Sequence, residues 1–178
     1  ILFVHRLSPV RKTLYYIPFI ISEFFKVQSK SEFHFAFAGK GPEENELRQA
    51  IEDAQVSDGI TLLGAIPNNQ IDQLYKSADI FINPTYAEGF PRVLIEAMAC
   101  GLPIVTTDAG GIVDILCHSQ KEFMIAKEDR IHFAQKLIEL SNDQQLQNEL
   151  AKGNLLQVKS FSTEAIAGMY IKKLGLTN

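Results

Sequence analysis

Short apolar runs alternate along this chain with longer segments of helical period, and this alternation is the feature that most constrains its fold. The runs are rich in β-branched and aromatic residues, as buried strands are. Parallel strands joined by crossover helices produce this order of elements. We therefore expect a doubly wound α/β architecture, a parallel sheet of about six strands with helices on both faces. The strands are predicted over 1–4, 33–38, 60–63, 80–83, 103–106 and 123–125.

The helices between these strands are predicted near 12–26, 43–54, 69–77 and 92–100, with a short one after Gly111. After Glu128 the strand pattern stops, and three helical stretches follow at 129–141, 143–159 and 162–174. In the last stretch, one face gathers Ile166, Met169, Tyr170 and Leu174. This helical C-terminal extension has two interpretations, since its last two helices could cover the sheet or pack on a missing domain.

The composition favours one globular domain and excludes several classes of protein. The chain has 178 residues, 46% of them apolar, and a formal net charge of −4, which excludes disorder. Its 17 Lys and Arg residues are scattered, so no basic block favours a nucleic-acid partner. No apolar run approaches the roughly 20 residues needed to span a bilayer. Cys100 and Cys117 have neither zinc-ligand spacing nor the density of a disulfide scaffold, which indicates reduced thiols in a cytoplasmic protein.

A basic loop follows the first predicted strand. Arg6, Arg11 and Lys12 lie between the end of that strand and the start of a helix. Ligands of an open parallel sheet bind outside the carboxyl ends of its strands, and cations beside free helix N–H groups suit an anion such as a diphosphate. A solvated basic turn is the alternative interpretation of the same residues.

The most informative stretch joins an apolar strand to a loop that carries Glu88 and then to a helix that carries Glu96. Glu96 sits in an otherwise apolar run, where burial without a polar partner would be costly. The two hydroxyls of a vicinal diol could donate to such a carboxylate, and the structural alternative is an arginine partner or a backbone cap. The amides of Gly89 and Phe90, near the helix start, could bind phosphate oxygens at the same time.

Other motifs argue against several kinds of site. Gly39-Lys40-Gly41 permits a tight turn with close backbone approach, but it lacks the third glycine of a dinucleotide fingerprint. The four histidines have no spacing suited to a metal or a nucleophile pair, and no serine lies in a nucleophile elbow. A nicotinamide site, a metal enzyme and a hydrolase therefore find no support in these motifs.

Taken together, the motifs resemble those of the C-terminal, donor-binding half of retaining GT-B glycosyltransferases, in the group 1 type family that includes many bacterial polysaccharide transferases. The most specific motif is a Glu-x7-Glu pair, which reads Glu88-Gly89-Phe90-Pro91-Arg92-Val93-Leu94-Ile95-Glu96. Supporting motifs follow in the family's order, namely Arg6-Leu7 with Lys12, Ala38-Gly39-Lys40-Gly41-Pro42, Gly64-Ala65-Ile66-Pro67 and Gly110-Gly111. The resemblance covers nearly the whole chain and implies a Rossmann-like domain that is one half of a GT-B fold.

The resemblance implies roles for the residues of the Glu-x7-Glu motif. Glu88 is expected to contact the hydroxyls of the transferred sugar, and Glu96 is expected to hold the ribose hydroxyls of the nucleotide. The amides of Gly89 and Phe90 are expected to approach the sugar and the phosphates.

Other implied roles fall on the loops after the first and third strands. Arg6 and Lys12 match the pair that binds the donor diphosphate, where they would stabilise charge on the departing group. The backbone around Ala65 and Ile66 is expected to face the base. Neither a metal ion nor another cofactor is expected, in keeping with the absence of an Asp-x-Asp pair from the sequence.

Three positions depart from the family pattern. His5 stands where a glycine usually precedes Arg6, and Thr13 stands where a glycine usually follows Lys12. Pro91 stands where many members have glycine, and it removes one amide donor.

We expect the whole protein to transfer a sugar from a nucleotide diphosphate donor, with UDP as the nucleotide, to a glycan or lipid-linked acceptor with retention of configuration. The chain opens at Ile1 inside a strand pattern and without an initiator Met. We therefore interpret residues 1–178 as a nucleotide-sugar-binding fragment, inactive alone, that lacks an N-terminal acceptor domain. Related enzymes commonly dock on membranes through that half, so the full-length protein is expected in the cytoplasm or at the inner face of the membrane. The alternatives are a non-catalytic nucleotide-sugar-binding module and a GT-B nucleotide-sugar epimerase.

Overall fold

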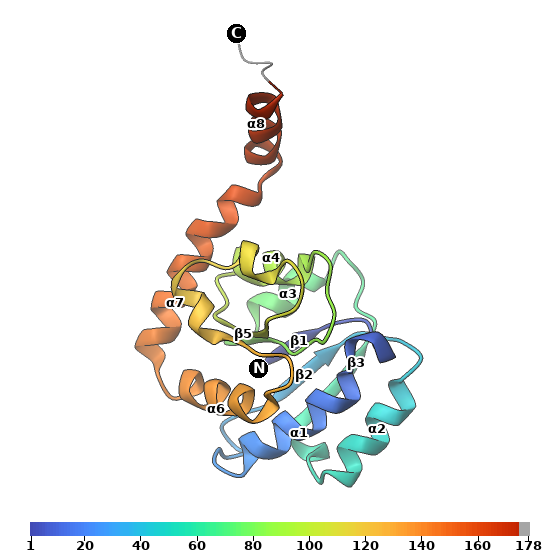
Figure 1. The fold of residues 1–178 in the computed structure, drawn as a ribbon. Coiled ribbons are helices and arrows are strands. Elements are labelled where there is room, and N and C mark those ends of the chain that lie inside the picture. The colour runs from blue at the N-terminus through green and yellow to red at the C-terminus, as the bar shows by residue number, and fades with distance from the viewer. Residues whose placement is uncertain (175–178) are drawn as a thin grey trace.

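In the described part of the chain, six parallel strands form one sheet in the order β3-β2-β1-β4-β5-β6. Figure 1 shows this sheet between its helices. The structure, a computed structural model, describes residues 1–174, so residues 175–178 of the predicted domain lie outside the described residues. Each predicted strand is confirmed, with bounds β1 (Leu2–Val4), β2 (Phe35–Ala38), β3 (Ile60–Gly64), β4 (Phe81–Asn83), β5 (Ile104–Thr107) and β6 (Met124–Ile125). The doubly wound sheet expected from the alternation of elements is therefore present.

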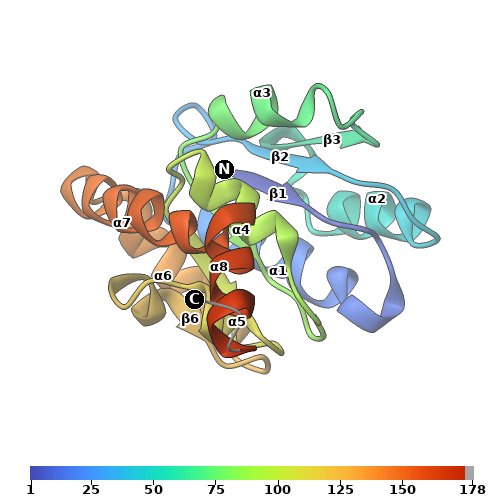
Figure 2. The same cartoon turned by 90° about the horizontal axis from the view of Figure 1, so that it is seen from above.

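Helices cover both faces of this sheet, as predicted (Figures 1 and 2). They are α1 (Thr13–Phe25), α2 (Glu44–Asp53), α3 (Ile71–Lys76), α4 (Arg92–Ala99), α5 (Ile112–Ile115), α6 (Arg130–Ser141), α7 (Gln144–Gln157) and α8 (Thr163–Lys173). Helices α1, α2 and α6 share one buried core with the strands, and α3, α4 and α5 share the other. None of the helices in the described part of the chain has both the length and the apolar character that crossing a membrane needs.

The strands feed both cores because successive residues of a strand point to opposite faces. Phe81 and Ile104 are buried under α3, α4 and α5. Their neighbours Ile82 and Val105 are buried under α1 and α6. Burial on both faces explains why the strands appear in the sequence as continuous apolar runs.

The strand order reverses between β1 and β4. From β1 the chain winds outward to β2 and β3, and it then returns to place β4 on the other side of β1. The loops that follow two such strands diverge and leave a crevice at the carboxyl edge of the sheet. The loops after β1 and β4 are the two segments in which the sequence places its cations and Glu88.

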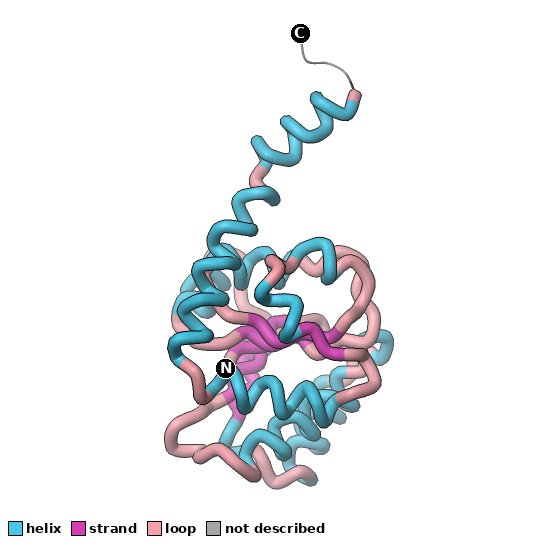
Figure 3. The backbone as a smooth tube through the Cα atoms, turned by 60° about the vertical axis from the view of Figure 1, so that its left-hand side comes forward, coloured by secondary structure: helices cyan, strands magenta, loops and turns pink. Residues whose placement is uncertain are grey.

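The two last helices differ in how they pack. Helix α7 contacts α4 and α6, and it buries Leu150 and Asn154. Helix α8 buries no residue and projects away from the sheet (Figure 3). Its predicted apolar face is exposed, including Met169, Tyr170 and Leu174. The interpretation that both helices cover the sheet is therefore wrong for α8.

Candidate functional site

Two adjoining pockets open at the carboxyl edge of the sheet. The wider pocket has a volume of about 480 Å³ and the narrower one about 380 Å³. Both are lined by His5, Arg6, Val93 and Glu96. The pockets, called here the carboxyl-edge pockets, therefore lie beside the point where the strand order reverses, which is where ligands of such sheets bind.

Glu88 lies in the loop after β4, with its side chain only 9% exposed. Arg11 donates a hydrogen bond to Glu88 Oε2 from the loop after β1. His5 Nε2 lies 3.3 Å from the same oxygen and 2.6 Å from Arg11 Nη1, so the tautomer of the ring decides whether Nε2 donates to Glu88 or accepts from Arg11. Burial raises the pKa of Glu88, but the hydrogen bonds from His5 and Arg11 outweigh this and leave the pKa below its ordinary value. Glu88 is held as a carboxylate.

Backbone contacts fix the loop that carries Glu88. The Tyr86 N–H donates to the Arg11 carbonyl oxygen at 3.1 Å, which joins the loops after β4 and β1. Gly110 has a φ of 61°, and a Cβ at this position would lie 1.8 Å from the Glu88 carbonyl oxygen. Only glycine fits so close an approach in the left-handed region. The position of Glu88 therefore depends on three loops of the same sheet edge.

Glu96 lies in the second turn of α4 and lines both pockets. Its side chain is exposed, while Leu94 and Ala97 of the same helix face the core. The phenol of Tyr75 donates to Glu96 Oε2 at 2.9 Å. Burial, followed by the charge of Glu96, raises the pKa of Tyr75, so this hydroxyl stays protonated. A carboxylate has more acceptor sites than one such bond uses, which leaves Glu96 able to accept from a ligand.

The wider pocket extends toward the loops after β2 and β3. Ala65 and Ile66, after β3, line it together with Gly39, after β2. The Gly39 N–H donates to the Gly64 carbonyl at 2.7 Å, and a Cβ on Gly39 would lie 1.8 Å from the His5 carbonyl oxygen. The predicted close approach of backbone at this glycine is therefore present.

Most of the predicted site residues line the two pockets, namely Arg6, Ala65, Ile66, Glu88, Phe90 and Glu96. Gly89 and Lys12 line neither pocket. The Gly89 N–H donates to Glu88 Oε1 at 3.2 Å, and the Phe90 side chain is 57% exposed. The roles that the resemblance implies for these residues stay predictions.

Arg11 and His5 are the neighbours of Glu88 for which the motifs imply no individual role. The resemblance selects Lys12, but the Lys12 ammonium lies 3.4 Å from the centroid of the Tyr86 ring, and Arg11 lies beside Glu88. One signal in the sequence could have shown that only one of Arg11 and Lys12 enters the pocket. Arg11 and Lys12 are adjacent, and consecutive side chains seldom point into the same pocket.

Residues 1–174 contain no cluster of three or more His, Cys, Asp or Glu side chains that could hold a metal ion. Cys100 and Cys117 have free thiols, and neither lines the carboxyl-edge pockets. The expectation that the reaction needs no metal ion or other cofactor stays a prediction.

Comparison with known families and curated proteins gives one consistent result. The family model described as glycosyl transferases group 1 matches residues 1–155. N-acetyl-alpha-D-glucosaminyl L-malate synthase of Bacillus anthracis is 26% identical over 152 residues, which cover 85% of this chain and 39% of that protein. The amylovoran biosynthesis glycosyltransferase AmsK of Erwinia amylovora is 33% identical over 115 residues, covering 61% of this chain and 28% of AmsK. The chain thus spans well under half the length of these relatives.

Solved structures share the fold at low sequence identity. Anabaena Alr3699/HepE in complex with UDP matches with a TM-score of 0.82 and 22% identity, over 99% of this chain and 48% of that one. The C-terminal domain of the group 1 glycosyl transferase LpcC from Francisella tularensis matches with a TM-score of 0.75 and 22% identity, over 89% of this chain and 84% of that one. These matches show that the whole described architecture is one found in solved proteins.

Proposed function

Because the chain belongs to the glycosyl transferases group 1 family, we propose that it is the donor-binding half of an enzyme that transfers a sugar from UDP, with retention of configuration, to a glycan or lipid-linked acceptor. One observation carries the proposal. Glu88, Glu96 and Arg6 meet at adjoining pockets outside the carboxyl ends of β1 and β4. The solved HepE structure, which shares the fold, holds UDP and supports this choice of nucleotide.

Glu96 lines both pockets. In this proposal the donor extends from one pocket into the other, past Glu96. We assign the ribose to Glu96, whose carboxylate accepts hydrogen bonds from the two ribose hydroxyls. The base then lies in the wider pocket against the backbone of Ala65 and Ile66. The phosphates and the sugar lie in the narrower pocket, near the amides of Gly89 and Phe90.

In the transfer step, the bond between the anomeric carbon and the diphosphate oxygen breaks, the acceptor hydroxyl oxygen bonds to that carbon on the same face of the sugar, and the hydroxyl proton passes to the departing diphosphate. Negative charge builds up on the diphosphate as it leaves. Arg6 and one cation of the Arg11 and Lys12 pair stabilise this charge. The carboxylate of Glu88 accepts hydrogen bonds from the sugar hydroxyls and orients the anomeric carbon.

The acceptor side of the reaction belongs to a further, N-terminal domain in this proposal. The chain spans 39% of the Bacillus anthracis relative, and a donor-binding half without acceptor groups is expected to transfer little. We place the whole enzyme in bacterial polysaccharide biosynthesis, in the cytoplasm or at the inner face of the membrane. Peripheral contact with that membrane is assigned to the N-terminal domain.

Calorimetric titration of UDP, GDP and uridine into the 178-residue chain tests donor binding. We expect saturable binding of UDP that is tighter than binding of GDP or uridine, and absence of UDP binding would contradict the proposal. NMR analysis of products from the full-length protein then tests the reaction. A retained anomeric configuration is expected, whereas an epimerised donor, or bound donor without product, would identify the epimerase or the binding module.

A further inference from the structure

Lys12 has an unusual backbone conformation between the 3₁₀ turn Pro9–Arg11 and α1. Its φ is 54° and its ψ is 40°, in the left-handed region. This region is unfavourable for a residue with a Cβ, whereas glycine adopts it freely. A lysine stays in this conformation where surrounding contacts compensate for the cost.

The left-handed turn separates two neighbouring cations. Arg11 lines the narrower pocket and donates to Glu88. Lys12 lines neither carboxyl-edge pocket, and its Nζ lies 3.4 Å from the centroid of the Tyr86 ring. A guanidinium has five N–H donors, so Arg11 can hold Glu88 and still donate to a diphosphate in the same pocket.

Tyr86 contacts both members of this pair. The Lys12 ammonium rests on its ring, and its N–H donates to the Arg11 carbonyl oxygen at 3.1 Å. The ring packs against the buried core under α1 and α6, with Lys127 Nζ at 5.3 Å from its centroid. Because packing against the core fixes the position of the Tyr86 ring, the ring can in turn fix the position of the Lys12 ammonium. An ammonium over an aromatic face is stabilised by the ring quadrupole.

We propose that Tyr86 is a positioning residue for donor binding: its ring stabilises the left-handed turn at Lys12, and this turn aims Arg11, in place of Lys12, at the donor diphosphate. The inference rests on the proposed function, because it needs a diphosphate in the narrower pocket. Arg11 is then the ligand, and Lys12 has a conformational role. Without the ring, Lys12 leaves the left-handed region and Arg11 turns away from Glu88.

A matched pair of variants at position 12 tests this assignment by calorimetric titration of UDP into the 178-residue chain. Lys12→Met removes the ammonium but keeps the Cβ and its strain, so we expect UDP affinity to fall about fivefold. Lys12→Gly removes the strain as well, so we expect affinity within about twofold of the parent. Arg11→Gln removes the proposed ligand and should weaken binding about tenfold or more.

Tyr86 is tested by rescue. Tyr86→Leu should weaken UDP binding about fivefold, whereas Tyr86→Phe keeps the ring and should stay within about twofold of the parent. Adding Lys12→Gly to Tyr86→Leu should restore the parent affinity, because glycine needs no ring to hold the left-handed turn. A residue that acts only through packing would not be rescued in this way.

Two results would overturn the proposal. Equal losses of UDP affinity in Lys12→Met and Lys12→Gly would show that Lys12 itself is the ligand. If Lys12→Gly does not restore the UDP affinity of Tyr86→Leu, Tyr86 is only a packing residue. If circular dichroism shows that Tyr86→Leu does not fold, the comparison of Lys12→Met with Lys12→Gly still tests the proposal, since Lys12 lies outside the buried core. A parent chain that does not bind UDP would overturn the proposed function and this inference with it, an outcome distinct from the other two.

Discussion

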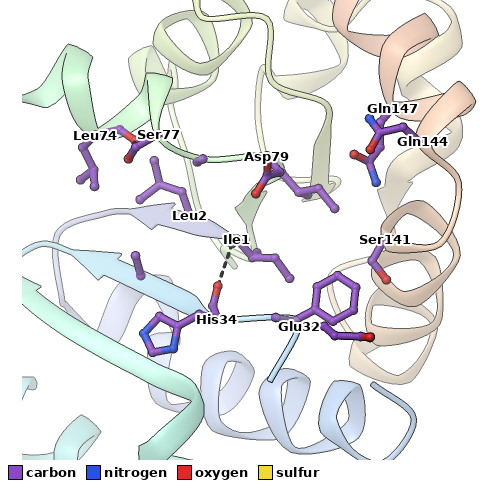
Figure 4. A pocket seen from close by; sticks show the side chains of 14 residues that line it. Ile1, Leu2, Glu32, His34, Leu74, Ser77, Asp79, Ser141, Gln144 and Gln147 are labelled. Atoms are coloured by element: carbon purple, nitrogen blue, oxygen red, sulfur yellow. Dashed lines mark hydrogen bonds between the residues drawn. The ribbon is translucent and has the colours of Figure 1, made fainter. Parts of the chain in front are cut away.

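Pockets of similar volume open at the two ends of the sheet, but their linings differ in charge. The amino-edge pocket, of about 410 Å³, lies where Ile1, Glu32, His34, Asp79 and Gln144 come together (Figure 4). The amine of Ile1 donates to the His34 carbonyl oxygen there at 2.8 Å. Among the described residues, no Lys or Arg lines this pocket. The carboxyl-edge pockets are lined instead by four cations, Arg6, Arg11, Lys40 and Arg92, and by Glu88 and Glu96.

The difference shows that volume alone does not identify a site in this fold. A diphosphate needs cations near its oxygens, and the acidic lining of the amino-edge pocket, with Glu32 and Asp79, would repel it. The carboxyl edge has those cations because the loops after β1 and β2 and the start of α4 all reach it, carrying Arg6 with Arg11, Lys40 and Arg92. Variants at each edge can therefore test whether the cations of the carboxyl edge make it the site that binds a diphosphate.

The largest expected effect is a loss of stability at Gly110, where two loops of the carboxyl edge approach each other closely. Gly110→Ala would place a Cβ 1.8 Å from the Glu88 carbonyl oxygen at a φ of 61°. We expect the free energy of unfolding to fall by about 3 kcal/mol. Gly89→Ala is the control, because nothing lies within 4 Å of a Cβ at that position. Urea unfolding compares the two, and equal stabilities would show that the loops do not need this contact.

Glu96→Ala should have the largest effect on binding. Losing the hydrogen bonds that a carboxylate accepts from a ligand costs about 2 kcal/mol, or about thirtyfold in UDP affinity. Glu32→Ala removes the same charge from the amino-edge pocket and should leave UDP affinity unchanged. Calorimetry on both variants measures the contrast. A loss in the Glu32 variant with none in the Glu96 variant would move the site to the opposite edge.

Arg6→Gln should weaken binding of the phosphates without affecting binding of the nucleoside. We expect UDP to bind about tenfold more weakly, because a charge-assisted hydrogen bond to phosphate is lost. Uridine has no phosphate, so its affinity should not change. Arg48→Gln, on the exposed surface of α2, is the matched control. If uridine binding weakened as much as UDP binding, Arg6 would have another role.

The smallest effect concerns pH. Burial raises the pKa of Glu88, but His5 and Arg11 bring it below its ordinary value of 4.5. Its charge therefore stabilises the fold above that ordinary value, and this contribution is lost as pH falls through the lower folded pKa. We expect Glu88→Gln to have a Tm about 2–4 °C below the parent near pH 6, with the gap closing toward about pH 3. Thermal unfolding across this range measures it, and a gap that widens in acid would contradict the account.

Much of the fold was predictable because local chemistry determines it. Each strand is an apolar run bounded by turn residues, and each helix between strands has an apolar face of helical period. The neighbourhood of Glu88 and Arg6 was predictable for a related reason. Loops after adjacent parallel strands reach the same edge of a sheet whatever their distance in sequence.

The parts that sequence could not supply depend on contacts between distant segments. Whether Arg11 or Lys12 enters the narrower pocket follows from the left-handed φ of Lys12, and its companion Tyr86 belongs to another loop. The apolar run around Glu96 predicted that its carboxylate meets a polar group, but the sequence did not identify that group as Tyr75, which lies on another helix.

The proposed function requires that UDP binds at the carboxyl edge of the sheet. The most direct test is an NMR titration of UDP into the ¹⁵N-labelled 178-residue chain. We expect saturable shifts in the amides of the non-proline residues within 5–12, 38–41, 64–66 and 86–96, with the amides of 32–34, 77–80 and 141–147 unmoved. Shifts centred on the second set, around the amino-edge pocket, would contradict it.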